Sequence, residues 1–281
     1  MKVTYKVGDY YDGSDKRPEG SFRISPSSVE DFFSKKRQWY GENLLGEDKK
    51  FTGSTATLNG TLVHFVAETV ANCKIHKEEY NSEKLHNAVA EYISKFEGNE
   101  DYDTSMVQST WKDMGEALVK AFVLEANTLA TEVYEQYEIQ PGIFVAGTMD
   151  AIVSSSPTDT IDNIKDPTGV LTLVDFKTSS TKASSFSYKY TLQAMCYCYM
   201  LRQKGINITN MELQFVTKAT KTLPIRTYKF TKPFDDQAHT FIEGILKLIA
   251  ESVECFKNYE DLQFLLACDY RLKKNDIPRP S

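Results

Sequence analysis

The sequence predicts an α/β (α+β) protein in which helices flank a mixed central sheet. Apolar, β-branched runs typical of strands occupy about residues 131–140, 143–153 and 170–178, and a hairpin pattern follows at 211–230. Helical periodicity surrounds these strands. The helices are expected at about 60–74, 82–97 and 106–130 before the strands, and at about 187–204 and 235–258 after them.

Composition is that of an ordinary globular protein. The chain has 281 residues, of which 41% are hydrophobic and 26% charged. No apolar run approaches a membrane span and the N-terminus lacks a signal-peptide core, so we expect a cytoplasmic protein, in the host cytoplasm if viral, that does not contact a membrane. The net charge of −6 argues against simple coating of nucleic acid. Basic groups at 35–37, at Lys218 with Lys221, and at 271–274 are interpreted as solvated faces.

No linker demands a domain boundary, so residues 1–281 are predicted to form one domain. Within it we expect a helical portion at about 60–130, a catalytic core at about 131–230 and C-terminal helices at about 231–281, including a short one near 260–269. Ser27 and Glu30 have the spacing of a capping box at the start of a helix. Residues 46–59 are interpreted as a loop.

The five cysteines argue against disulfides and thiolate-bound metal, because their number is odd and none forms a CxxC pair. Cys196 and Cys198 lie in an apolar helical stretch and are expected in the core.

Asp175 and Lys177 close the third strand and are the main candidates for chemistry. Residues two apart on a strand project from the same face, which turns Phe176 to the other side. Asp150 stands near the end of the preceding strand. Two carboxylates and an ammonium at neighbouring strand ends suit phosphodiester hydrolysis, since the acids can hold a divalent cation and the lysine can stabilise charge or orient water. The alternative is an exposed ion pair that contributes little to stability.

Three helical residues extend this set. His64 lies on the apolar helix with Glu68 one turn later, although a lone histidine there is usually a core or capping residue. Gln193 and Tyr197 are spaced i, i+4 on the helix after Lys177. Glu132 precedes Asp150 on the neighbouring strand; it is either an acid beside the site or, as we expect, an exposed strand charge.

In this order the residues resemble the PD-(D/E)XK nuclease superfamily, and within it the RecB-type nuclease domains. The family pattern is a helical His, then G-x-x-D, then [D/E]-x-K, then Q-x-x-x-Y. The matching residues are His64, Gly147 with Asp150, Asp175 with Lys177, and Gln193 with Tyr197. The resemblance runs from about residue 22 to 230.

The resemblance implies a restriction-endonuclease-like core that binds Mg²⁺ or Mn²⁺. His64, Asp150, Asp175 and the backbone carbonyl of Phe176 would be the ligands, and an imidazole ligand would favour Mn²⁺. Lys177 would position or help deprotonate the attacking water. Gln193 and Tyr197 would orient Lys177 or contact the DNA backbone.

One departure concerns the iron–sulfur cluster that many relatives carry on one cysteine after the opening helix and three near the C-terminus. Residues 35–37 are Lys-Lys-Arg here, and only Cys255 and Cys268 lie late in the chain. We therefore predict no cluster.

The resulting hypothesis is a metal-dependent DNA exonuclease acting in recombination, repair or phage DNA processing. Candidate partners are DNA, a single-strand annealing or recombination protein, and further copies of the chain. Two alternatives stay open: a structure- or strand-specific endonuclease of the same fold, and an idle nucleic-acid-binding or scaffold subunit.

Overall fold

The computed structural model describes residues 3, 5–7, 17–44, 53–179, 185–219 and 224–258. The expected helix near 260–269, Cys268, Lys221 and the basic group at 271–274 lie outside these residues. No helix in the described ranges is long and apolar enough to cross a membrane.

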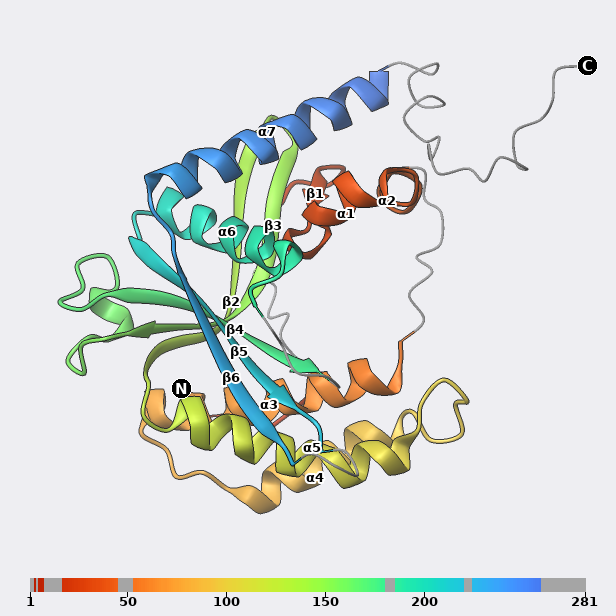
Figure 1. Cartoon of the computed structure of the whole chain (residues 1–281), viewed down its shortest axis with the longest axis vertical. Coiled ribbons are helices and arrows are strands. Elements are labelled where there is room, and N and C mark those ends of the chain that lie inside the picture. Colours follow the sequence, from red (N-terminus) through yellow and green to blue (C-terminus); the bar gives the residue numbers. More distant parts are fainter. Residues whose placement is uncertain are drawn as a thin grey trace, which may run out of the picture.

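A six-stranded mixed sheet forms the centre of the molecule (Figure 1). Its strand order is β1-β3-β4-β5-β6, and β2 pairs with β3 outside this path. The β1–β3 and β4–β5 pairs are parallel, and the other pairs are antiparallel. The strands are β1 (Phe22–Ile24), β2 (Asn127–Gln140), β3 (Ile143–Ser154), β4 (Leu171–Ser179), β5 (Ile208–Thr217) and β6 (Arg226–Pro233).

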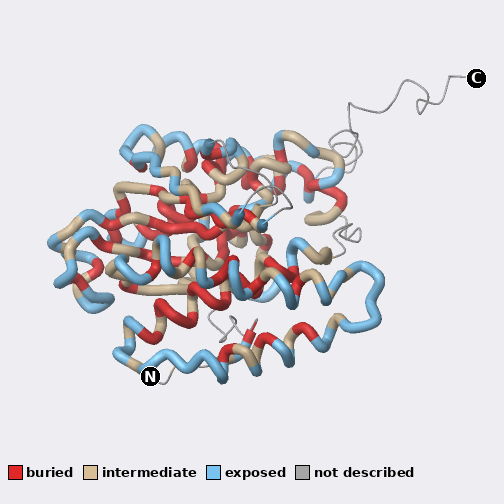
Figure 2. The backbone as a smooth tube through the Cα atoms, turned by 60° about the horizontal axis from the view of Figure 1, so that its bottom comes forward, coloured by how far each residue is buried: buried red, intermediate tan, exposed pale blue. Residues whose placement is uncertain are grey.

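Helices cover both faces of this sheet, which confirms the predicted fold class. Helices α6 (Tyr188–Gln203) and α7 (Asp236–Asn258) lie on one face, and α3 (Thr55–His76), α4 (Ser82–Ser94) and α5 (Thr104–Leu118) lie on the other. Two short helices, α1 (Val29–Ser34) and α2 (Lys36–Asn43), lie beside β1 at one end of the molecule. The buried backbone is concentrated in the sheet and the helix faces against it (Figure 2).

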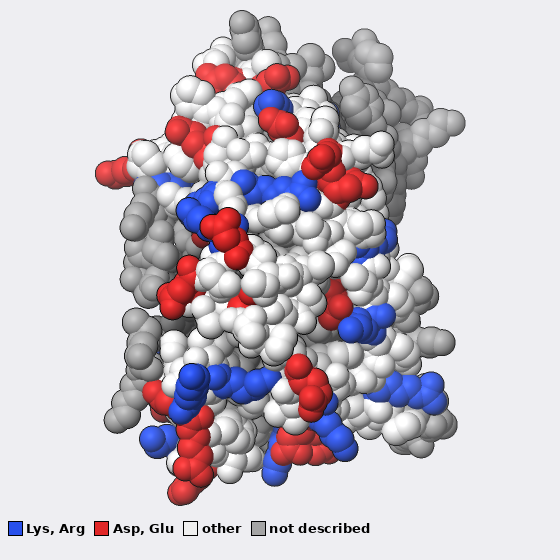
Figure 3. Space-filling model, turned by 90° about the vertical axis from the view of Figure 1, so that its left-hand side faces the viewer, with Lys and Arg blue, Asp and Glu red and all other residues white. Residues whose placement is uncertain are grey.

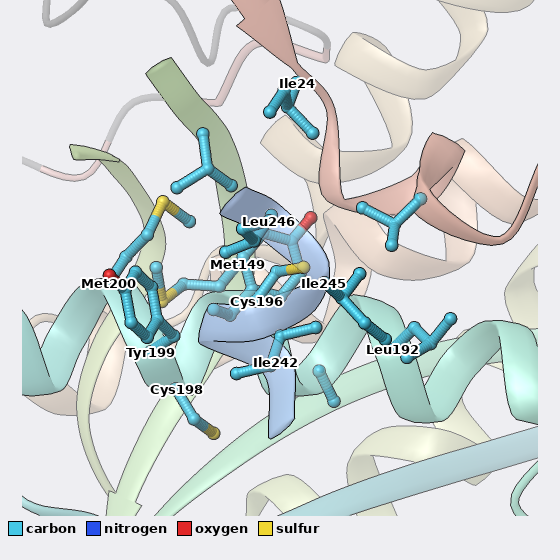
Figure 4. Close-up of a cluster of buried hydrophobic side chains, with 14 of the residues drawn as sticks. Ile24, Met149, Leu192, Cys196, Cys198, Tyr199, Met200, Ile242, Ile245 and Leu246 are labelled. Atoms are coloured by element: carbon cyan, nitrogen blue, oxygen red, sulfur yellow. The ribbon is translucent and has the colours of Figure 1, made fainter. Parts of the chain in front are cut away.

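Helix α6 is almost entirely apolar where it lies between the sheet and α7 (Figure 4). Cys196 and Cys198 are fully buried in this cluster, as predicted. Met149 of β3 and Leu246 of α7 reach the same cluster from the two sides. Because α6 contacts both layers, the start of this helix is held firmly over the sheet.

Two helix boundaries differ from the sequence prediction. Helix α3 begins at Thr55, inside the expected loop, because the side chain of Ser54 accepts a hydrogen bond from the backbone of Thr57 and caps the helix. The helix expected over 106–130 ends at Leu118, continues through a π-helical turn to residue 123, and gives way to β2. The ammonium of Lys74 donates to the carbonyls of Val123, Leu124 and Ala126 and so satisfies the end of this turn.

The capping-box prediction at Ser27 is wrong. Residues Pro26–Ser28 form a 3₁₀ turn, and α1 starts after Ser28 without a side-chain cap. The hydroxyl of Ser27 instead contacts that of Ser25 at 3.1 Å. Proline at the first position of the turn explains why the chain tightens here before the α-helix begins.

Strands β3 and β4 separate at the positions that matter most. One edge of β3 is paired with β2 along its length, whereas the other edge pairs with β1 at 143–145 and with β4 at 151–154. Among the described strands, none continues the ladder along that edge at 146–150. The last pair before the strands diverge is Ala151 with Val174, so Asp150 and Asp175 are the first residues beyond it.

The connection between β3 and β4 is fastened by Asp159, which is 2% exposed. Its carboxylate accepts hydrogen bonds from the Ser154 hydroxyl and from the backbone N–H groups of Thr168 and Gly169. These hydrogen bonds hold the pKa of Asp159 well below its usual range, and the bond from Ser154 contributes most. The two strands therefore enter the short ladder from a fixed turn.

Candidate active site

Asp150 lies at the point where β3 and β4 separate. Its Oδ2 accepts a hydrogen bond from the backbone N–H of Phe176 at 2.5 Å, so the carboxylate takes the place of the missing strand partner. Its Oδ1 lies 3.6 Å from Nδ1 of His64, which α3 presents from the other layer. Burial alone would raise the pKa of Asp150, but His64, Lys177 and the backbone N–H of Phe176 together outweigh burial, and the pKa is lowered.

Asp175 and Lys177 form a buried ion pair on β4, with Nζ and Oδ2 2.5 Å apart. Their side chains are only 5% and 16% exposed, so the exposed-pair alternative is wrong. Burial raises the pKa of Asp175 despite the nearby ammonium. Burial alone would lower the pKa of Lys177, but Asp175 and then Asp150 raise it above its usual value, which keeps the ammonium charged.

Phe176 points to the opposite side of the strand, as predicted. It is 4% exposed and packs with apolar residues of α3, and its ring meets the imidazole of His64 edge-on at 5.9 Å between centroids. The described contacts of Phe176 therefore fix both the helix that holds His64 and the carboxylate of Asp150.

Glu132 departs from expectation, because it lies in the acidic cluster and not on an exposed strand surface. Its backbone is in the left-handed region, with φ of 48°, at the place on β2 opposite Asp150. Burial, followed by the charges of Asp150, Glu68 and Asp175, raises the pKa of Glu132 to about 9. Glu132 thus carries a proton at neutral pH when the cluster holds no cation.

Gln193 and Tyr197 face the same cluster from α6. The amide Nε2 of Gln193 donates to the Tyr197 hydroxyl at 3.4 Å. Tyr197 packs directly on β3, because a Cβ at Gly147 would lie 3.1 Å from its ring and 3.1 Å from Pro26. The glycine of the Gly-x-x-Asp motif therefore lets the tyrosine approach the strand three residues before Asp150.

Tyr190 is the residue that the sequence reasoning missed. Its ring centre lies 5.1 Å from the ammonium of Lys177, a cation–π contact from the first turn of α6. Tyr190 precedes Gln193 by three residues and Tyr197 by seven, so it shares their helix face. That spacing was a usable signal.

The donor set fits a hard divalent cation, although the described His, Cys, Asp and Glu side chains form no group of three arranged tightly enough to hold a metal. Asp150 and Asp175 offer carboxylate oxygens and His64 offers an imidazole nitrogen, which suit Mg²⁺ or Mn²⁺. Mutual repulsion contributes to the raised pKa values of Asp175 and Glu132. A cation between these groups would relieve that repulsion.

The model of the PD-(D/E)XK nuclease superfamily matches residues 23–269. The chain belongs to the PD-(D/E)XK nuclease superfamily. No curated protein matches it significantly.

Two solved structures are similar to this chain, and the first of them supports the fold. A candidate exonuclease from Eubacterium rectale is 16% identical, with a TM-score of 0.51 over 92% of this chain and 87% of that one. An alkaline exonuclease from Laribacter hongkongensis is 12% identical, with a TM-score of 0.37 over 86% and 91% of the two chains.

The protein surface carries mixed charge on the side of the β3–β4 connection. Acidic and basic side chains are interspersed on this face (Figure 3). Such a pattern does not attract a polyanion strongly.

Proposed function

We propose that the chain is a Mg²⁺- or Mn²⁺-dependent deoxyribonuclease that degrades DNA from its ends. The observation that carries this proposal is the convergence of Asp150, Asp175, Lys177 and His64 where β3 and β4 diverge. Membership of the nuclease superfamily supports hydrolysis of nucleic acid. DNA as the substrate and exonucleolytic action extend the sequence-based hypothesis.

In this proposal Asp150, Asp175 and His64, with the Phe176 carbonyl, hold the cation. The cation supplies charge neutralisation at the scissile phosphate and acidifies bound water. The ammonium of Lys177 stabilises negative charge that develops on the phosphate oxygens and orients the water.

The contacts of Lys177 preorganise this role. The ammonium of Lys177 contacts the carboxylate of Asp175 on one side and the ring of Tyr190 on another. Little reorganisation of Lys177 is therefore needed when substrate binds. Gln193 and Tyr197 stand beside the pair and steady the α6 face. A recombination or annealing partner and self-assembly are proposed on the sequence resemblance alone.

The decisive test is degradation of end-labelled linear DNA and covalently closed circular DNA with Mg²⁺, Mn²⁺ or EDTA. The wild type is compared with Asp175→Asn, which keeps the size of the side chain, and with Asp166→Asn, an exposed acid in the β3–β4 connection. We expect metal-dependent loss of linear DNA that Asp175→Asn abolishes and Asp166→Asn retains. Cleavage of circles would assign an endonuclease, and no cleavage in any condition would refute the enzyme proposal.

A further inference from the structure

A cavity of about 290 Å³ lies beside the candidate active site, at the end of β4. Thr178 and Ser179, which line it, directly follow Lys177 on the strand. Ala56 and Asn59 line it from the first turns of α3, the helix that also carries His64. The cavity therefore shares its two main walls with the catalytic cluster.

The charge of this cavity is positive. Among the described residues that line it, Lys218 is the only charged one and none is acidic. The ammonium of Lys218 lies 3.7 Å from the thioether sulfur of Met106, which is a weak acceptor and does not neutralise the charge. Lys177, by contrast, pairs with a carboxylate. Lys218, which the sequence analysis interpreted as part of a solvated face, is half-buried against Met106 in the structure.

Backbone contacts hold these groups in place. The N–H of Lys218 donates to the carbonyl of Ser179 at 3.1 Å, which continues the β4–β5 pairing beyond β5. A Cβ at Gly60 would lie 3.0 Å from the Thr178 hydroxyl, so α3 approaches β4 closely at this point. The N-terminal end of a long helix adds a partial positive charge.

We infer that this cavity binds a phosphate group of the DNA strand next to the scissile one, with Lys218 as its counter-charge. The inference rests on the proposed nuclease function. Thr178 and Ser179 add hydroxyl donors at the same wall. Each strand residue advances about 3.3 Å, so the cavity begins one to two residue steps from Lys177.

The ammonium of Lys218 would offset the repulsion between a bound phosphate and the acidic cluster. The carboxylates of Asp150 and Asp175 repel a polyanion, and the chain carries a net charge of −6. A fixed cation on the adjacent wall gives the bound strand one favourable contact that does not depend on the metal.

The test compares Lys218→Gln with Lys247→Gln, which removes the same charge from the exposed face of α7. Cleavage rates are measured over a range of linear duplex concentrations. We expect KM to rise about tenfold for Lys218→Gln with kcat within about twofold, since the contact binds substrate and transition state alike. Lys247→Gln should match the wild type, and Lys218→Arg should restore most of the affinity. Equal KM values for Lys218→Gln and Lys247→Gln would overturn the inference.

Two substrates identify the source of the phosphate. The KM of Lys218→Gln is compared with that of the wild type on DNA with 5′-phosphate ends and on DNA with 5′-hydroxyl ends. A KM increase limited to the phosphorylated DNA assigns the bound group as a terminal phosphate monoester. The same KM increase on both substrates assigns it as an internal phosphodiester. Either result supports a phosphate site.

A binding measurement separates this inference from the nuclease proposal. Fluorescence anisotropy of a labelled oligonucleotide is measured over a range of NaCl concentrations in EDTA, which needs no cleavage. Lys218→Gln should make the slope of log K against log salt shallower by about one unit. If the wild type binds DNA but never cleaves it, the nuclease proposal fails, while the slope still tests whether Lys218 binds a phosphate. A slope that is the same for Lys218→Gln and the wild type overturns the phosphate-site inference.

Discussion

Glu132→Gln offers a test of the acidic cluster that needs no substrate. The pKa of Glu132 is raised from 4.5 to about 9, first by burial and then by neighbouring acids. In metal-free protein between these two pH values, the folded state therefore holds one proton that the unfolded state has lost. The free energy of unfolding then falls by about 1.4 kcal/mol for each unit of rising pH.

The sign follows from the direction of the shift. Below pH 4.5 both states are protonated and the stabilising contribution is fully present; it is lost progressively as pH rises toward 9. From pH 6 to pH 8 the wild type should lose about 2.7 kcal/mol relative to Glu132→Gln, which has nothing to ionise. Glu91→Gln, an exposed position on α4, should keep the wild-type dependence.

Urea unfolding at pH 6, 7 and 8 in EDTA, followed by circular dichroism, measures the difference. Saturating Mg²⁺ should flatten the wild-type dependence, because a cation favours the ionised carboxylate. If the free energy of unfolding in EDTA changes with pH in the same way for the wild type and Glu132→Gln, the raised pKa of Glu132 is refuted.

Three further outcomes are expected. Lys177→Ala should lower turnover on linear DNA by at least about 100-fold with normal circular dichroism, and a rate near the wild type would contradict its assignment. Gly147→Ala should lower the free energy of unfolding by about 1–3 kcal/mol, because its Cβ presses on Tyr197 and Pro26; Gly244→Ala, in open space on α7, should not destabilise the protein. Mn²⁺ or Mg²⁺ at about 100 times its Kd should add about 2.7 kcal/mol in thermal unfolding, and an equal gain in Asp150→Asn would contradict that ligand.

The sequence predicted the parts of the site that depend on local periodicity. Asp175 and Lys177 share a face because alternation along a strand is local, and Gln193 and Tyr197 meet because i, i+4 spacing brings side chains together on a helix. Cys196 and Cys198 were placed in the core on the apolar character of their neighbours.

What the sequence could not predict depends on pairing between distant segments. The separation of β3 from β4 after Ala151 and Val174 is decided by which strands occupy each edge. The burial of Glu132 requires a left-handed backbone inside a strand, for which glutamate gives no signal. Helix α3 starts early because one serine caps it in a threonine-rich stretch that also resembles a loop.

The four-pair ladder between β3 and β4 has a consequence for engineering the chain. Residues 151–154 and 171–174 form the ladder that aligns Asp150 with Asp175, and a slip of one residue would turn one carboxylate to the opposite face. Asp159 secures that alignment by accepting hydrogen bonds from Ser154, Thr168 and Gly169. The exposed tip of the connection, at Lys165 and Asp166, contributes no donor to these three bonds. We therefore expect a fluorescent or affinity module inserted at this tip to leave Asp150 and Asp175 in their present alignment.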